Sequence, residues 1–106
     1  MKIPEKVKIG GIDYEVIMVP LKSEELNYGD AIGSITHTDC KIWINKDMPI
    51  QKQQETLIHE IIHAIDVFVG DSNCEYFEEN VESFGKVLYQ VLRDNNLNIT
   101  GKREPV

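Results

Sequence analysis

Apolar and polar positions alternate with a period of two in four short stretches of the first half of the chain. The first two stretches, within residues 7–19, lie on either side of Gly10-Gly11, a pair typical of a tight hairpin turn. The other two, residues 31–38 and 40–45, flank a polar turn at Thr38-Asp39. The pattern therefore predicts two β-hairpins and a small, mostly antiparallel sheet.

The apolar period changes to 3.6 residues in the second half of the chain, as expected for amphipathic helices. Pro49 and the periodic residues after it predict a helix over Ile50–Val69 that ends at Gly70. A second helix is predicted from about Glu75 to Asp94. The residues expected to face the core are Leu57, Ile58, Ile61, Ile62, Ile65, Phe68 and Val69 in the first helix and Phe77, Val81, Phe84, Leu88, Val91 and Leu92 in the second.

Consecutive hairpins followed by two helices indicate the α+β fold class. We expect the sheet to pack on the first helix and the second helix to cross the first. Because a second core would leave neither half enough apolar surface to bury, the 106 residues are predicted to form one domain, residues 1–97. The polar residues 98–106 are expected to form a flexible tail.

Eleven basic and eighteen acidic residues give a formal net charge of −7, which disfavours binding to nucleic acid and to anionic membrane surfaces. No apolar run has the length of a signal peptide near Met1 or of a membrane span elsewhere. Cys40 and Cys74 lack the spacing of a redox or zinc-binding pair and are interpreted as reduced thiols. These features predict a cytoplasmic protein that binds neither nucleic acid nor membranes, and they leave its oligomeric state open.

Residues 59–63 form the motif H-E-x-x-H within the first predicted helix. His59 and His63 are four residues apart, so a helix carries both imidazoles on one side, close enough to bind one tetrahedral zinc ion. Glu60 is expected beside the metal, where its carboxylate can take a proton from zinc-bound water. The motif is typical of zinc peptidases and predicts a Zn²⁺ site with Glu60 as the general base.

A hydrolytic zinc ion usually has a third protein ligand and an open position for water. We expect Glu78 to be this ligand, because it precedes Val81 by three residues and Gly85 by seven and so shares the inward face of the second helix. Glu82, one turn later, is the alternative. It could replace Glu78 as ligand or hydrogen-bond a ligating histidine.

His37, the third histidine, falls in the second predicted hairpin. We interpret it as an exposed strand residue, with a catalytic or substrate-binding role as the alternative. Tyrosine hydroxyls are candidate donors to the oxyanion of a transition state. Their spacing singles out none of Tyr14, Tyr28, Tyr76 and Tyr89.

The run T-L-I-H-E-I-I-H-A-I over Thr56–Ile65, followed by E-x-x-V-E-S-F-G over Glu78–Gly85, resembles the small phage and bacterial zinc peptidases of the ImmA/IrrE type. The resemblance covers the two helices and, more loosely, the preceding hairpin. It implies a minimal zincin-like fold of the gluzincin kind, with the leading glutamate of the second segment, Glu78, as third zinc ligand. The family more often has alanine, asparagine and alanine at three positions of that segment, occupied here by Val81, Glu82 and Gly85.

The motif and the resemblance together predict a zinc-dependent metallopeptidase that hydrolyses peptide bonds, with a repressor-type regulatory protein of a phage or prophage as the expected substrate. An extended peptide would bind at a sheet edge beside the zinc ion by strand addition. One alternative is a zinc-containing binding module without proteolytic activity. Another is a phage structural or interaction protein in which the motif is incidental, and metal content separates these classes.

Overall fold

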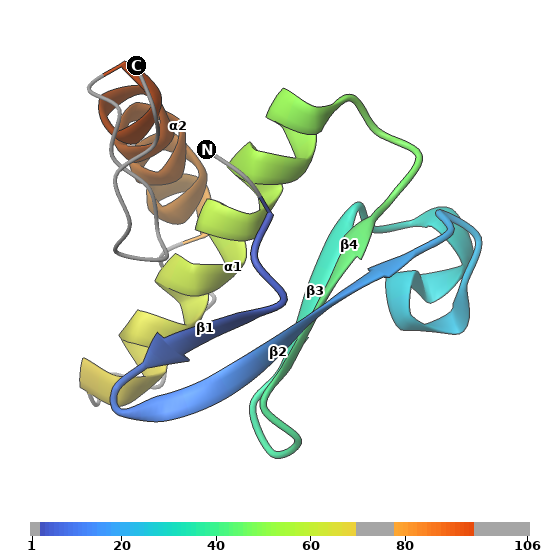
Figure 1. Ribbon diagram of the computed structural model, residues 1–106, viewed down its shortest axis with the longest axis horizontal. Helices are drawn as coiled ribbons and strands as arrows, with labels where there is room; N and C mark the ends of the chain where they lie inside the picture. The colour runs from blue at the N-terminus through green and yellow to red at the C-terminus, as the bar shows by residue number, and fades with distance from the viewer. Residues whose placement is uncertain (1–2, 70–77, 95–106) are drawn as a thin grey trace.

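The computed structural model describes residues 3–69 and 78–94 (Figure 1). The described part belongs to the α+β class, as predicted. The expected helix boundaries at Gly70 and Glu75 and the expected tail, residues 98–106, lie outside the described residues. In chain order the elements are β1 (Lys6–Ile9), β2 (Ile12–Val19), a short 3-10 helix η1 (Glu24–Gly29), β3 (Gly33–Thr36), β4 (Lys41–Asn45), α1 (Ile50–Val69) and α2 (Glu78–Asp94).

The turn between β1 and β2 consists of Gly10 and Gly11, whose φ angles of 59° and 81° are both positive. A two-residue turn of this kind matches the twist of the strands it joins, and glycine adopts it without a steric penalty. The strands on either side pair in antiparallel fashion, with Val7 opposite Tyr14. The first predicted hairpin is therefore confirmed.

The strands β3 and β4 form the second predicted hairpin, in which Gly33 pairs with Ile44. β3 has four residues and is shorter than the predicted strand over 31–38, because the chain already turns at His37. The turn runs from His37 to Cys40 and is wider than the two-residue turn predicted. Cys40 has a positive φ of 53°, and its Sγ donates a hydrogen bond to the carbonyl oxygen of His37.

A parallel pairing of β2 with β4 joins the two hairpins and gives the strand order β1-β2-β4-β3. In this pairing Val16 lies beside Ile42, and Met18 lies beside Ile44. After β2 the chain passes through η1 to the edge of the sheet opposite β1, where it forms β3. β3 is therefore an edge strand of the described sheet, and β4 is a central one. The sheet is therefore mixed, and the expected antiparallel pairing holds within each hairpin but not between them.

One face of the sheet packs against α1, which lies diagonally across it (Figure 1). Trp43, between Ile42 and Ile44, is half buried, whereas these two isoleucines are buried, which confirms the predicted alternation. Burial of an aliphatic side chain contributes roughly 1.5–3 kcal/mol, so this interface fixes α1 on the sheet. The buried apolar cluster consists of Val7, Ile9, Tyr14, Val16, Ile42, Ile44, Leu57 and Ala64.

The helix α1 has the predicted bounds, Ile50–Val69. Hydrogen bonds fix its start relative to the end of β4. The amide of Asp47 donates to Asn45 Oδ1 (2.8 Å), and Gln53 Nε2 donates to the carbonyl oxygen of Met48 (2.9 Å). This short link determines where the middle of α1, which carries the histidines, lies over the sheet.

The helix α2 packs mainly against α1 rather than on the sheet (Figure 1). Val81, Gly85 and Tyr89 are buried there, and the Tyr89 hydroxyl donates a 2.6 Å hydrogen bond to Gln54 Oε1. The predictions that Ile65 and Phe84 face the core are wrong, because these residues are 46% and 62% exposed. Phe84 lies at the margin of the buried stripe of α2. Both helices have a polar face, and no helix among the described residues contains an apolar stretch that could traverse a bilayer.

Candidate metal centre

The two histidines of the motif converge on the same side of α1, as their spacing predicts. The Nε2 atoms of His59 and His63 lie 3.2 Å apart. Their ring centroids are 4.9 Å apart, with an interplanar angle of 64°. Both side chains are half buried, so each is held by its surroundings and still reaches the surface of a cleft.

The separation of the two Nε2 atoms fits a shared cation. In a tetrahedral zinc site with Zn–N bonds of about 2.0–2.1 Å, two nitrogen ligands lie roughly 3.3 Å apart. The separation of 3.2 Å between His59 and His63 is close to that value. The same distance fits a hydrogen bond between the rings, in which the Nε2–H tautomer of one histidine donates to Nε2 of the other. The separation of the two nitrogens is thus compatible with two ligands of one metal ion.

Glu60 completes a compact group with the two histidines. One potential ligand atom from each of His59, Glu60 and His63 lies within 4.8 Å of the other two. Glu60 is 6% exposed, so its carboxylate lies largely out of bulk water. A carboxylate in that position can hold a metal directly or exchange a proton with a molecule beside the metal. These residue types could hold a divalent cation such as zinc.

A cleft of about 610 Å³ opens over this group. We call it the histidine cleft. Its walls come from β3 and the segment before it, from α1 and from α2. Residues that line it include Gly33, His37, His59, Glu60, His63 and Glu82. The cleft therefore joins the motif to the edge strand and to the second helix, which are far apart in the sequence.

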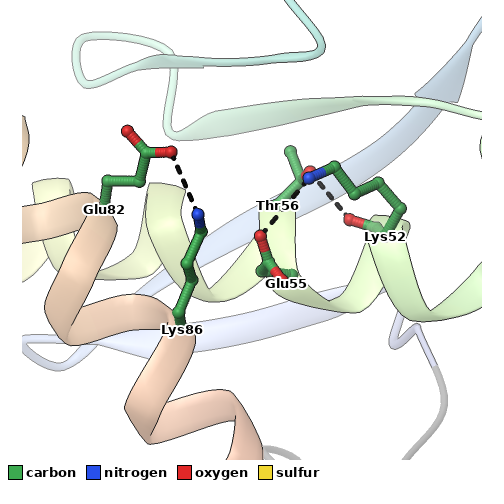
Figure 2. A network of polar contacts seen from close by, with 5 residues as sticks. All are labelled: Lys52, Glu55, Thr56, Glu82 and Lys86. Carbon is green, nitrogen blue, oxygen red and sulfur yellow. Dashed lines mark hydrogen bonds and ion pairs between the residues drawn. The ribbon is translucent and has the colours of Figure 1, made fainter.

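Ion pairs line the rim of the histidine cleft (Figure 2). Lys52 Nζ lies 3.5 Å from Glu55 Oε1 on α1, and Lys86 Nζ lies 3.5 Å from Glu82 Oε1 on α2. All four charged groups are partly exposed. Opposite charges are thus balanced on each helix, and Asp30 adds a further carboxylate to the lining of the cleft.

For Glu78, the expected third ligand, the structure gives the position of the backbone but not of the side chain. Glu78 is the first residue of α2, but its side chain lies outside the part of the chain that the structure describes. Glu82 lines the cleft, pairs with Lys86 and does not belong to the compact group around the histidines. Helix α2 passes close to the motif at Gly85, where an added Cβ would lie 3.7 Å from the Cα of His59.

His37 also lines the histidine cleft, a position that the sequence interpretation as an exposed strand residue missed. It lies in the turn after β3, is half buried, and its Nδ1 is 3.4 Å from the hydroxyl of Tyr14. The two rings meet edge to face, with centroids 6.4 Å apart. The sequence held a partial signal, because Gly33, Ile35 and His37 follow one another at the two-residue spacing of a strand face, although His37 itself lies in the turn.

Tyr14 is almost wholly buried in the core, with 2% of its surface exposed. Burial raises the pKa of its hydroxyl above the ordinary value of 10.0, and the nearby Cys40 thiol, when ionised, raises it further. Tyr14 therefore stays protonated and able to donate a hydrogen bond at neutral pH.

The other three tyrosines were also candidate donors to an oxyanion. Tyr28 is 70% exposed and does not line the cleft, and the Tyr89 hydroxyl donates to Gln54. Tyr76 lies outside the described residues.

Comparisons of the chain with models of known protein families, with curated protein sequences and with solved structures found no match. The case for a function therefore comes from the site itself and from the motif around it.

Proposed function

We propose that this chain is a zinc-dependent metallopeptidase with a minimal zincin-like fold. The observation that carries the proposal is the convergence of His59 and His63, whose Nε2 atoms are 3.2 Å apart, beside the buried carboxylate of Glu60. The group lies in a cleft that reaches the edge of a sheet. These features support the proposal because a metallopeptidase needs metal ligands, a proton acceptor and a place for an extended chain close together.

The roles of the residues follow from their chemistry. A zinc ion held by His59 and His63 would acidify a water molecule and polarise the peptide carbonyl. Glu60 is the proton acceptor: its carboxylate takes a proton from the attacking water and delivers it to the nitrogen of the leaving amine. The low exposure of Glu60 supports this role, because exclusion of bulk water strengthens its interactions in the cleft.

A carboxylate from α2 is the third ligand in this proposal, and Glu78 is our choice. Glu82 is 59% exposed and pairs with Lys86, so using it as a ligand would require breaking that ion pair. Glu78 precedes Glu82 by one helical turn and Gly85 by two turns, and Gly85 is the point where α2 approaches His59. The resemblance to the ImmA/IrrE type supports the same residue.

The substrate is proposed to be a peptide segment in extended conformation. β3 is an edge strand of the described sheet, and residues 30–35, which include β3's Gly33, line the histidine cleft. Strand addition would satisfy the unpaired backbone groups of such an edge and carry a peptide past the histidines. A repressor-type regulatory protein of a phage or prophage is the substrate that the resemblance suggests.

The test is digestion of a mixture of synthetic peptides by zinc-loaded protein, followed by mass spectrometry. We expect cleavage by the wild type and none by Glu60→Gln, which keeps the size of the side chain but removes the proton acceptor. Glu55→Gln, a change of the same kind at the rim of the cleft, is the matched control and should retain cleavage. Stoichiometric zinc without any cleavage would favour the binding module, and equal cleavage by Glu60→Gln would refute the role of Glu60.

A further inference from the structure

His37 is a polar residue in the histidine cleft that the proposed chemistry does not yet use. It comes from the turn after β3, whereas His59, Glu60 and His63 all come from α1. His37 is also not part of the compact group of potential ligand atoms that these three residues form. It therefore lines the cleft from another element without belonging to the metal site.

The ring of His37 is held on one side by the core. Its Nδ1 faces the hydroxyl of Tyr14 at 3.4 Å, and Tyr14 itself is buried in the sheet. The carbonyl oxygen of His37 accepts a hydrogen bond from Cys40 Sγ at 3.4 Å, which closes the turn behind it. The Tyr14 contact thus holds the Nδ1 side of the ring, and the Cys40 contact holds the turn that carries it. Nε2 lies on the opposite edge of the ring, and His37 lines the histidine cleft.

We propose that His37 donates a hydrogen bond from Nε2 to the carbonyl oxygen of a bound peptide and stabilises the negative charge that develops there during attack. Tyr14 acts as the positioning residue that selects this tautomer. The role rests on the proposed peptidase function, because it requires a peptide carbonyl in the histidine cleft.

The tautomer follows from the donor and the acceptor in the Tyr14–His37 contact. The buried phenol stays protonated at neutral pH, and its oxygen can either donate to Nδ1 or accept from it. We infer that it donates, which makes Nδ1 the unprotonated nitrogen. In a neutral imidazole the proton is consequently on Nε2. If the Tyr14 hydroxyl is removed, no donor holds Nδ1 in its unprotonated form. We then expect a smaller fraction of His37 rings to have the proton on Nε2.

The other groups of the cleft are less suited to this task. Glu60 can only accept hydrogen bonds when ionised, and the Thr56 hydroxyl already donates to the carbonyl oxygen of Lys52 at 2.8 Å. Lys52 and Lys86 pair with glutamates on the rim. Ser34 lines the cleft from β3 and is the donor that an experiment has to compare with His37.

The first test requires neither zinc nor a substrate. Nitrogen-15 chemical shifts of the imidazole rings are measured at pH 8, above the ordinary histidine pKa of about 6.5, for the wild type and for Tyr14→Phe. We expect His37 of the wild type to be the Nε2–H tautomer and the variant to show a mixture of tautomers. A wild-type ring protonated on Nδ1 would overturn the proposal.

The second test measures the affinity of zinc-loaded protein for two probes by calorimetry. One is a peptide phosphoramidate, whose tetrahedral anionic phosphoryl group mimics the developing oxyanion, and the other is a planar peptide hydroxamate. His37→Phe should weaken phosphoramidate binding about 100-fold, the effect of losing one oxyanion donor, and hydroxamate binding much less. His37→Gln, which restores an N–H donor, should recover part of the loss. A loss of phosphoramidate binding in Ser34→Ala as large as that in His37→Phe would assign the role to Ser34 and overturn the proposal.

The outcomes separate this role from the proposed function. Zinc affinity should be the same in His37→Phe and the wild type, because His37 is not a ligand. If the wild type cleaves a peptide, His37→Phe should lower kcat about 100-fold with little change in KM. Cleavage with an unchanged kcat, or equal weakening of both probes, would overturn the role of His37 and leave the peptidase intact. A wild type that binds neither zinc nor phosphoramidate would overturn both.

Discussion

Gly33 of β3 lies directly against Thr56 of α1, so closely that a Cβ on Gly33 would overlap the Thr56 methyl group. The same added carbon would lie 3.5 Å from Glu60 Cγ. The edge strand can therefore approach the motif helix only because residue 33 has no side chain. This contact sets the width of the histidine cleft at the point where β3 faces Glu60.

Substitution of Gly33 by alanine should therefore destabilise the fold. We expect Gly33→Ala to lower the free energy of unfolding by about 1–3 kcal/mol, the usual effect of overpacking a filled site. Thr56→Ser in the same chain removes the methyl group but keeps the hydroxyl that donates to Lys52, so the double variant should recover most of the loss. Urea denaturation of the two single variants and the double variant measures this coupling.

Gly85→Ala is the matched control for that experiment. An added Cβ at residue 85 would lie 3.5 Å from Ile62 Cδ1 and 3.7 Å from His59 Cα, which are ordinary contacts. Because alanine also favours the helix by about 0.5–1 kcal/mol relative to glycine, this variant should be as stable as the wild type or more so. A loss as large as that of Gly33→Ala would contradict the packing described for the two glycines.

The hydrogen bond from Tyr89 to Gln54 joins α2 to α1 and should contribute to stability. Tyr89→Phe removes a buried 2.6 Å bond and should lower the free energy of unfolding by about 1 kcal/mol. Tyr28→Phe, at a residue that is 70% exposed, should leave it unchanged. Equal unfolding free energies for the two variants would show that this contact does not stabilise the helix pair.

Stability at alkaline pH should depend on Tyr14. Its pKa in the folded chain is raised above 10.0 by burial and by Cys40, so the unfolded chain loses this proton first. The contribution of neutral Tyr14 is fully present below about pH 10 and is lost as the pH rises through the folded-state pKa. Urea denaturation between pH 8 and 11 should show a steeper fall for the wild type than for Tyr14→Phe; parallel curves would contradict the burial effect.

The part of the site that sequence analysis predicted is the part formed within one element. The bounds of α1 follow from its long 3.6-residue period and from Pro49, and the convergence of His59 and His63 follows from their spacing on that helix. Such features need no knowledge of which elements meet in space. The hairpin over Gly10 and Gly11 is local in the same sense.

The features that sequence analysis missed depend on contacts between distant elements. Alternation identifies the strands but not the parallel pairing of β2 with β4, since both strands would show the same pattern in either direction. His37 reaches the cleft only because β3 is placed at the edge beside α1. Phe84 has the spacing of a core residue, but Tyr89 and Gly85 define the buried stripe, and Phe84 lies beside it.

The central claim is that His59 and His63 share a metal ion, and zinc titration of the metal-free protein by calorimetry tests it most directly. The account predicts one zinc ion per chain for the wild type and for Glu60→Gln. His63→Ala should lose stoichiometric binding, because it removes one of the two imidazoles that converge at 3.2 Å. A wild type that takes up no zinc, or His59→Ala and His63→Ala variants that bind zinc as tightly as the wild type, would contradict the account.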